Sequence, residues 1–171
     1  MKRIFLLVFM VAVTASMALA QKFAFVDSEY ILSNIPSYKS AQEQLDKISA
    51  EWQKEIEVKY ADIDKMYKAF QSEKVLLTDE MKTKREDEIV KKEQEVKDLQ
   101  KKYFGRDGSL FKKRQELVKP IQDQVYNAVK EISIEQGFAV IFDTASNPSI
   151  MYSNPKNDKS DEVLQKLGYK N

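Results

Sequence analysis

The sequence lacks cysteine and histidine altogether, and it has only four glycines and four prolines among its 171 residues. Without cysteine, the chain can form neither disulfide bonds nor thiolate metal sites. Without histidine, the commonest general base and the imidazole metal ligand are missing as well. Most nucleophile–base pairs are thereby excluded, and no glycine-rich phosphate loop is present. We therefore expect no enzyme, with no catalytic residue, no metal site and no cofactor.

The first twenty residues have the pattern of an export signal. Lys2 and Arg3 form a basic start, residues 4–13 are apolar, and Ala18-Leu19-Ala20 supplies the small residues that a signal peptidase cleaves after. A membrane anchor is the alternative, but the apolar run is short for a spanning helix. We expect cleavage after Ala20 and, because the leader resembles a bacterial one, a periplasmic destination.

Charge is abundant but balanced. Once Lys2 and Arg3 are removed with the leader, the remainder has one more acidic than basic residue. Such a chain has no global field that would favour nucleic acid or an anionic membrane. Two local clusters, Lys101-Lys102 and Lys112-Lys113-Arg114, are either a solvated helix face or a contact with an anionic surface. Contact with a membrane surface therefore stays open, and no nucleic-acid partner is expected.

Residues 37–74 predict one long amphipathic helix. No glycine or proline interrupts them, and Pro36 suits the first helical position, where its missing N–H has no partner to lose. Apolar residues recur at steps of three or four and fall on one stripe. The stripe comprises Leu45, Ile48, Trp52, Ile56, Tyr60, Ile63, Tyr67 and Phe70.

Residues 79–136 predict further helix, with Thr78 as its N-cap. Apolar side chains repeat every seven residues, at Ile89, Val96, Tyr103, Leu110 and Leu117, which is half of a coiled-coil seam. The other half is interrupted by Lys92, Arg106 and Lys113. A turn at residues 76–78 would pair the two helical blocks as an antiparallel hairpin. Pro120 predicts a kink or a break.

Two apolar stretches, residues 23–27 and 138–143, predict strands that pair with each other across more than a hundred residues. Residues 150–153 predict a further short strand, and Ser160 is expected to cap a last helix. The helical hairpin, residues 37–116, is thus an arm inserted between strands of a body formed by residues 21–36 and 117–171. This fold is mainly α with a small β body, and so small a body is expected to oligomerise.

The chain resembles the Skp/OmpH family of periplasmic chaperones over essentially the whole mature sequence. The resemblance is carried by "FAFVDSEYILSNIPSYKSAQEQL", by the long charged hairpin, by "YFGRDGSLFKKRQELVKPIQDQVYNAVKEISIEQGFAVIFD" and by "DEVLQKLG". It implies a homotrimer in which the strands of the subunits build a β-barrel-like core. It also implies that helical arms enclose a cavity holding unfolded outer-membrane or envelope proteins without ATP. Well-known members are strongly basic, so lipopolysaccharide binding is not carried over to this near-neutral chain.

Three sets of residues are candidates for these roles. The residues expected to join subunits are Phe23, Phe25, Val26, Phe138, Val140, Ile141, Phe142, Ile150 and Tyr152. The candidate client contacts on the arm are Trp52, Ile56, Tyr60, Tyr67 and Phe70, although helix–helix core is the plainer explanation of the same stripe. Gly105 and Gly108 mark either a local loop or a hinge that lets the cavity adjust. A structural coiled-coil spacer of the cell envelope is the alternative function.

Overall fold

The computed structural model describes residues 22–169, so the predicted leader lies outside the described residues. The chain divides into two compact units. We call residues 35–123 the helical unit, and residues 22–34 with 124–169 the strand unit. The fold is mostly helical and contains a small two-stranded parallel sheet. No helix within residues 22–169 is both long enough and apolar enough to cross a membrane.

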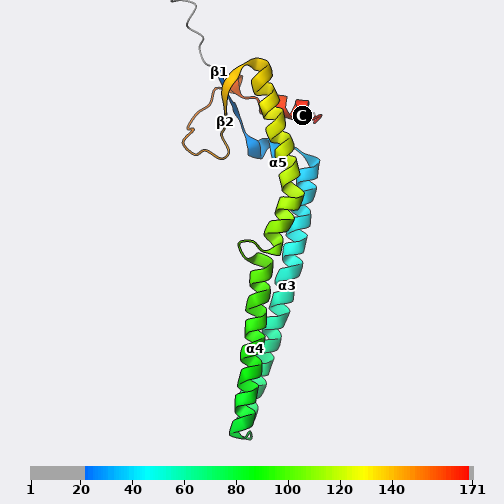
Figure 1. Ribbon diagram of the computed structural model, residues 1–171, viewed down its shortest axis with the longest axis vertical. Helices are drawn as coiled ribbons and strands as arrows, with labels where there is room; N and C mark the ends of the chain where they lie inside the picture. Colours follow the sequence, from blue (N-terminus) through cyan, green and yellow to red (C-terminus); the bar gives the residue numbers. More distant parts are fainter. Residues whose placement is uncertain (1–21, 170–171) are drawn as a thin grey trace, which may run out of the picture. The chain divides into compact units, whose positions relative to one another are not determined.

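The helical unit contains α3 (Pro36–Glu73), α4 (Asp79–Phe104) and the first part of α5 (Ser109–Gln136). As expected, Pro36 occupies the first turn of α3, and the Thr78 hydroxyl accepts a hydrogen bond from the Met81 N–H. The long helix predicted at residues 37–74 is confirmed within one residue at each end. After the turn at residues 74–78, α4 lies beside α3 (Figure 1).

The contact between α3 and α4 is a narrow apolar seam. Its buried residues are spaced by seven on each helix: Ile56, Ile63 and Phe70 on α3, and Ile89 and Val96 on α4. Polar pairs flank the seam, since Tyr103 donates to Glu55 and Arg85 lies 3.7 Å from Glu73. The seven-residue repeat read from the sequence is therefore correct for this part of the chain.

The helical block after residue 79 is interrupted at residues 105–108, between α4 and α5, which is the loop alternative predicted for Gly105 and Gly108, whereas no break occurs at Pro120. Pro120 lies inside α5, where it removes only the hydrogen bond to the carbonyl of residue 116. A Cβ on Gly105 would lie 2.3 Å from the Lys101 carbonyl oxygen, and a Cβ on Gly108 would lie 2.7 Å from that of Tyr103. These close backbone approaches explain why the chain breaks at its glycines.

The break also changes which residues of the following helix are buried. Leu110 and Leu117, which continue the seven-residue repeat of α4, are only half-buried. The buried positions are instead Val118 and Ile121, at 5% and 8% exposure. Val118 is buried where the repeat predicts Leu117, so the seven-residue repeat is not followed beyond Tyr103.

The strand unit comprises β1 (Lys22–Val26), α2 (Ser28–Ser33), the end of α5, β2 (Phe138–Asp143), the 3-10 helix η1 (Pro155–Asn157) and α6 (Ser160–Lys166). The predicted partners do pair: β1 and β2 are parallel, with Phe23 opposite Val140 and Phe25 opposite Phe142. Gly137 lets the chain turn directly from α5 into β2, because it adopts a positive φ of 69°.

Several contacts fix the short helices of the strand unit. The Lys166 ammonium lies 3.1 Å from Glu131 and 2.7 Å from Glu135 and so links α6 to α5.

Ser160 is not the expected cap but the first residue of α6. Its buried hydroxyl accepts from the Asp27 N–H at 2.8 Å and donates to Asp158 at 2.6 Å. This serine therefore joins the end of β1 to the start of α6.

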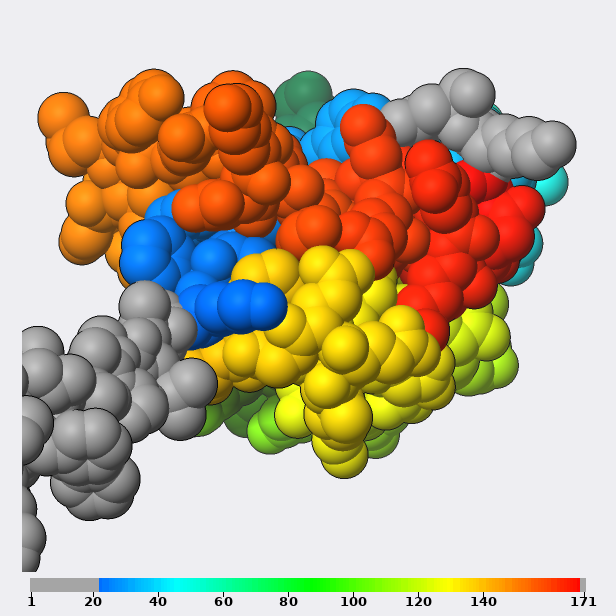
Figure 2. Space-filling view, turned by 90° about the horizontal axis from the view of Figure 1, so that it is seen from above, coloured from blue at the N-terminus to red at the C-terminus, as the bar shows by residue number. Residues whose placement is uncertain are grey.

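The third strand predicted at residues 150–153 is wrong, since Ile150 and Tyr152 lie outside any strand. A strand needs a free edge with which to pair. One edge of β1 is occupied by β2, and on the other the Phe25 carbonyl accepts from the Lys159 N–H. The free edge of β2 is not used by residues 150–153, which form an irregular, exposed surface segment (orange in Figure 2).

Candidate functional site

One face of the sheet is buried and the other is exposed and aromatic. Ala24 and Val26 are 0% and 6% exposed, whereas Phe23, Val140 and Phe142 are 51%, 47% and 41% exposed. Cross-strand partners in a parallel sheet point to the same side, so Phe23, Phe25, Val140 and Phe142 share the exposed face. We call these four residues the sheet patch.

Aromatic contacts organise the sheet patch. The Phe25 ring lies 5.8 Å from that of Phe142 and 5.9 Å from that of Phe23, in edge-on or tilted geometry. In the loop that follows β2, Met151 and Tyr152 are 94% and 78% exposed. Exposed aromatic surface of this kind, beside a free strand edge on β2, is typical of an interaction surface.

The remaining residues predicted to join subunits lie elsewhere. Val26 belongs to the buried face of the sheet and is not accessible. Phe138, Ile141 and Ile150 are half-buried, and the Lys159 ammonium lies 5.7 Å from the centre of the Phe138 ring. The structure therefore brings together Phe23, Phe25, Val140 and Phe142 but does not place Val26 with them.

The carboxylate of Asp143 fastens the ends of the two strands. It accepts from the Ser28 N–H and hydroxyl, from the Ala145 N–H at 3.2 Å and from the Ser146 hydroxyl at 2.7 Å. Burial opposes its ionisation, but hydrogen bonds from Ser146, Ser28 and Ala145 together outweigh burial and hold the pKa of Asp143 below its ordinary value. Asp27 caps α2 by accepting from the Tyr30 N–H. Both carboxylates thus accept hydrogen bonds from backbone N–H groups at the start of α2.

The candidate client contacts on α3 divide into two groups. Ile56 and Phe70 are 3% and 4% exposed because they belong to the seam with α4, where a client would not reach them. Tyr60 and Tyr67 are 41% and 52% exposed and lie one heptad apart. We call these two residues the tyrosine edge.

Trp52 is half-buried in an aromatic cluster that the sequence did not reveal. Its ring stacks on Tyr103 at 4.5 Å, with an angle of 5° between the planes, and meets Phe104 edge-on at 6.4 Å. The Tyr103 hydroxyl donates to Glu55, and this hydrogen bond raises the pKa of Tyr103. The seven-residue repeat identified Tyr103 as a seam residue, but no sequence signal placed it opposite Trp52.

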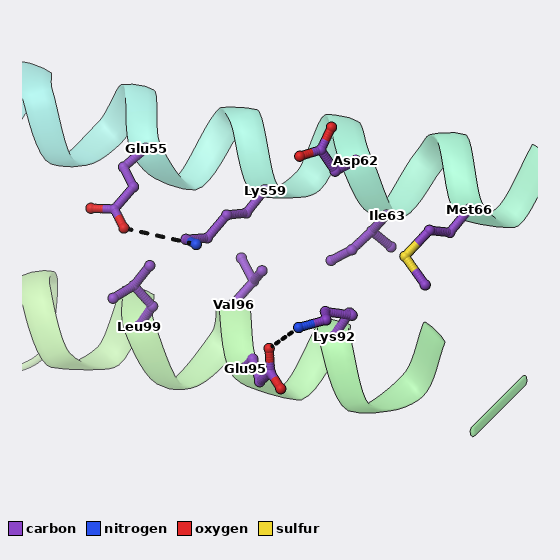
Figure 3. A pocket seen from close by; sticks show the side chains of 9 residues that line it. All are labelled: Glu55, Lys59, Asp62, Ile63, Met66, Lys92, Glu95, Val96 and Leu99. Carbon is purple, nitrogen blue, oxygen red and sulfur yellow. Dashed lines mark hydrogen bonds and ion pairs between the residues drawn. The ribbon is translucent and has the colours of Figure 1, made fainter. Parts of the chain in front are cut away.

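A groove of about 410 Å³ opens between α3 and α4 where lysines interrupt the seam (Figure 3). Ile63, Met66, Val96 and Leu99 form its apolar lining. At its rim Lys59 lies 3.9 Å from Glu55, and Lys92 lies 2.7 Å from Glu95. The Lys92 hydrogen bond holds the pKa of Glu95 below its ordinary value. The predicted weak half of the seam is thus a shallow amphipathic groove.

Gly105 and Gly108 lie in the loop between α4 and α5, as one of the two alternatives predicted. The Gly105 N–H donates to the Lys101 carbonyl, and the Gly108 N–H donates to the Gly105 carbonyl at 2.9 Å.

Within residues 22–169, no group of acidic side chains is arranged to hold a metal ion.

The chain is similar to known proteins of one family. The model of the family "Outer membrane protein (OmpH-like)" matches residues 22–167. A search among curated proteins gave no match. Among solved structures, an OmpH-like protein from Caulobacter crescentus CB15, assigned as an outer membrane chaperone, is 15% identical, with a TM-score of 0.66. That alignment covers 86% of this chain and 83% of the other. At this identity the structure supports the fold, and the family match extends over almost all described residues. The chain belongs to the OmpH-like family.

Proposed function

We propose that the protein is an ATP-independent periplasmic holdase that binds unfolded outer-membrane or envelope proteins. The observation that carries this proposal is the family match over residues 22–167. The assignment of the Caulobacter crescentus protein as an outer membrane chaperone agrees with it. The chain would act after export and removal of residues 1–20.

In this proposal the protein assembles as a homotrimer through the strand unit. A two-stranded sheet is marginal by itself, and the sheet patch leaves large aromatic side chains in water. Sheets from three subunits, joined at the free edges of β2 and over the sheet patches, would form a β-barrel-like core. The body would then comprise residues 21–36 and 117–171.

Residues 37–116 would form the arm, an antiparallel helical hairpin that acts as a short coiled coil. Support comes from two polar pairs, since Glu55 in the middle of α3 meets Tyr103 near the end of α4, whereas Glu73 at the end of α3 meets Arg85 near the start of α4, as in an antiparallel pair. The loop at Gly105 and Gly108 would act as a hinge that lets the arms adjust to clients of different size.

The arms would enclose a cavity in which exposed apolar segments of a client are shielded from one another. The tyrosine edge is suited to this task, since a tyrosine ring offers apolar contact and its hydroxyl can bond to many partners. Many weak contacts of this kind need no ATP. Binding the unfolded state lowers its free concentration, and the client leaves when folding or insertion provides a more stable state.

A structural coiled-coil spacer or scaffold of the cell envelope is the alternative, because it would use the same helices without client affinity. The discriminating experiment dilutes a urea-unfolded β-barrel protein into buffer with the purified protein and follows light scattering. The holdase proposal predicts suppressed aggregation at about one assembly per client. Unchanged scattering at a large excess of a folded assembly would favour the spacer.

A further inference from the structure

Three aromatic side chains connect the end of α4 to α3 immediately before the loop. The Trp52 ring stacks on the Tyr103 ring, with 4.5 Å between their centres, and the Phe104 ring lies edge-on at 6.4 Å from both. The Tyr103 hydroxyl donates to Glu55 at 2.9 Å. Tyr103 and Phe104 are the last two residues of α4, so these contacts stop where Gly105 ends the helix. We call Trp52, Tyr103 and Phe104 the aromatic cluster.

The aromatic cluster lies in a gap between two buried stretches of the helical unit. On α3, no residue between Leu45 and Ile56 is buried, and the structure describes all of them. In the equally well described stretch between Val96 and Val118, only Gly108 is buried, and it has no side chain. The three rings are half-buried. Much of the apolar contact in this gap therefore comes from side chains that solvent already reaches.

The backbone beside the aromatic cluster is interrupted on one side only. α3 continues without a break from Pro36 to Glu73, whereas the opposite chain leaves its helix at residues 105–108. A loop can take up a change of backbone direction, so the end of α4 can separate from α3 while α3 stays helical. Few buried contacts and a neighbouring loop are typical of a segment that opens locally, without global unfolding.

We propose that the aromatic cluster is a latch that governs local opening of residues 96–104 from α3. In the closed state, the stack of Trp52 on Tyr103 and the hydrogen bond to Glu55 hold the two helices together. In the open state, the rings separate and the end of α4 moves away with the loop, while the seam at Ile89 stays packed. Each of these contacts is weak by itself, so the open state is a minor but accessible population. The inference concerns the helix pair alone and does not depend on client binding.

The latch stands at one end of the groove between α3 and α4. Glu55 and Leu99 lie together at that end of the groove (Figure 3). Glu55 accepts from Tyr103, and Leu99 packs against the seam as Tyr103 does. Opening of the latch therefore lengthens the groove towards the loop and admits water to Val96, which is 2% exposed in the closed state.

The absence of cysteine allows the open state to be measured by thiol labelling. Val96→Cys places a thiol at a buried position one heptad from Tyr103, where a reagent reaches it only when α4 separates from α3. Adding Tyr103→Leu removes the stack but keeps an apolar side chain, and it should speed labelling about tenfold in urea far below the unfolding midpoint. Tyr103→Phe keeps the stack and removes only the bond to Glu55. Since that bond is exposed to solvent, its loss should speed labelling about threefold.

The matched control is Ile89→Cys, a thiol at a buried position of the same seam farther from the latch. Its labelling rate should not change when Tyr103→Leu is added, because the seam at Ile89 stays packed when the latch opens. Hydrogen exchange makes the same comparison without a label. Amides of residues 97–108 should exchange about tenfold faster in Tyr103→Leu, whereas those of residues 83–90 should not.

Equal acceleration at Val96→Cys and Ile89→Cys would mean that Tyr103 contributes only to global stability, and it overturns the latch. Labelling of Val96→Cys that Tyr103→Leu leaves unchanged also overturns it. Circular dichroism checks that each variant is folded. If Tyr103→Leu does not fold, the milder Tyr103→Phe decides by the same comparison of the two thiols.

Discussion

The Asp143 carboxylate accepts from the Ser28 N–H at 3.0 Å and from the Ser28 hydroxyl at 2.8 Å. These residues are 115 positions apart, so the pair closes the strand unit across the whole helical insertion. Since Ser28 begins α2, the carboxylate also lies where the helix dipole favours negative charge. The contact explains why two parallel strands so distant in sequence stay in register at their ends.

Replacing Asp143 with Asn should destabilise the protein by about 1–2 kcal/mol at neutral pH, because charged acceptors form stronger hydrogen bonds and the site is partly solvated. The pKa of Asp143 is lowered on folding. Its contribution is therefore complete above the ordinary aspartate pKa of about 3.9 and is lost as pH falls through the lower, folded value. Urea unfolding at several pH values should show the two proteins converging in acid. Asp46→Asn, on an exposed position of α3, is the control and should match the native protein throughout.

A lysine at Val140 or Phe142 should dissociate the assembly without unfolding the chain. Both side chains are more than 40% exposed, so the folded monomer tolerates a charge there, whereas a subunit interface would not. Analytical ultracentrifugation gives the mass, and circular dichroism checks the fold. Tyr126→Lys, on an α5 side chain that is 67% exposed, is the control. If Phe142→Lys keeps the native mass, subunits do not meet through the sheet patch.

Leucine at both Lys59 and Lys92 should stabilise the helical unit by about 1–2 kcal/mol. Each lysine faces the groove between α3 and α4, and leucine would extend the apolar lining there. Trp52 is the only tryptophan and lies in this unit, so its fluorescence reports unfolding locally. The control pair Lys54→Leu and Lys97→Leu lies outside the groove and should raise stability little. Equal effects of both pairs would mean that filling the groove is not the cause.

Gly108→Ala should lower stability by about 1–3 kcal/mol, because its Cβ would lie 2.7 Å from the Tyr103 oxygen and 2.9 Å from Gly105 backbone atoms. Asp107→Ala in the same loop is exposed and should cost little. Thermal unfolding measures both. The hinge proposal further predicts that the double variant Gly105→Ala, Gly108→Ala has a narrower distribution of spin-label distances between the arms. A broad, unchanged distribution in a folded double variant would exclude a hinge at these glycines.

Alanine at both Tyr60 and Tyr67 should weaken suppression of client aggregation several-fold, since both exposed rings are lost while the buried seam is kept. Light scattering of a urea-diluted β-barrel protein is the measurement. Val58→Ala with Val90→Ala removes similarly exposed apolar atoms elsewhere and is the control. Identical suppression by all three proteins would exclude the tyrosine edge as a client contact.

Periodicity predicted the parts of this fold that depend on one repeating pattern. Ile89 and Val96 lie in the seam that their seven-residue spacing indicated, and they pack with Ile56 and Ile63 of the stripe predicted on α3. The same rule failed beyond Tyr103, where Val118 is buried and Leu117, the position that the repeat predicts, is only half-buried. A local repeat contains no information about a loop whose geometry depends on backbone contacts at Gly105 and Gly108.

Strand pairing was predictable only where composition was distinctive. The apolar composition of β1 and β2 predicted that these two strands pair, and they do. Residues 150–153 have a similar composition but form no strand, although one edge of β2 stays unused, because strand pairing depends on where the whole fold places a segment. Likewise, the apolar stripe of α3 did not predict that Phe70 is buried and Tyr67 exposed, because the burial of each side chain depends on where α4 lies.

Native mass spectrometry of the protein mixed with a urea-diluted outer-membrane β-barrel protein tests the central claim most directly, because it gives the stoichiometry and client capture in one spectrum. The account predicts a homotrimer when the protein is alone and one client bound per trimer in the mixture. Tyr60→Ala with Tyr67→Ala should leave the trimer intact and reduce the fraction that carries client. A correctly folded protein that never carries a client, at any excess, would contradict the account.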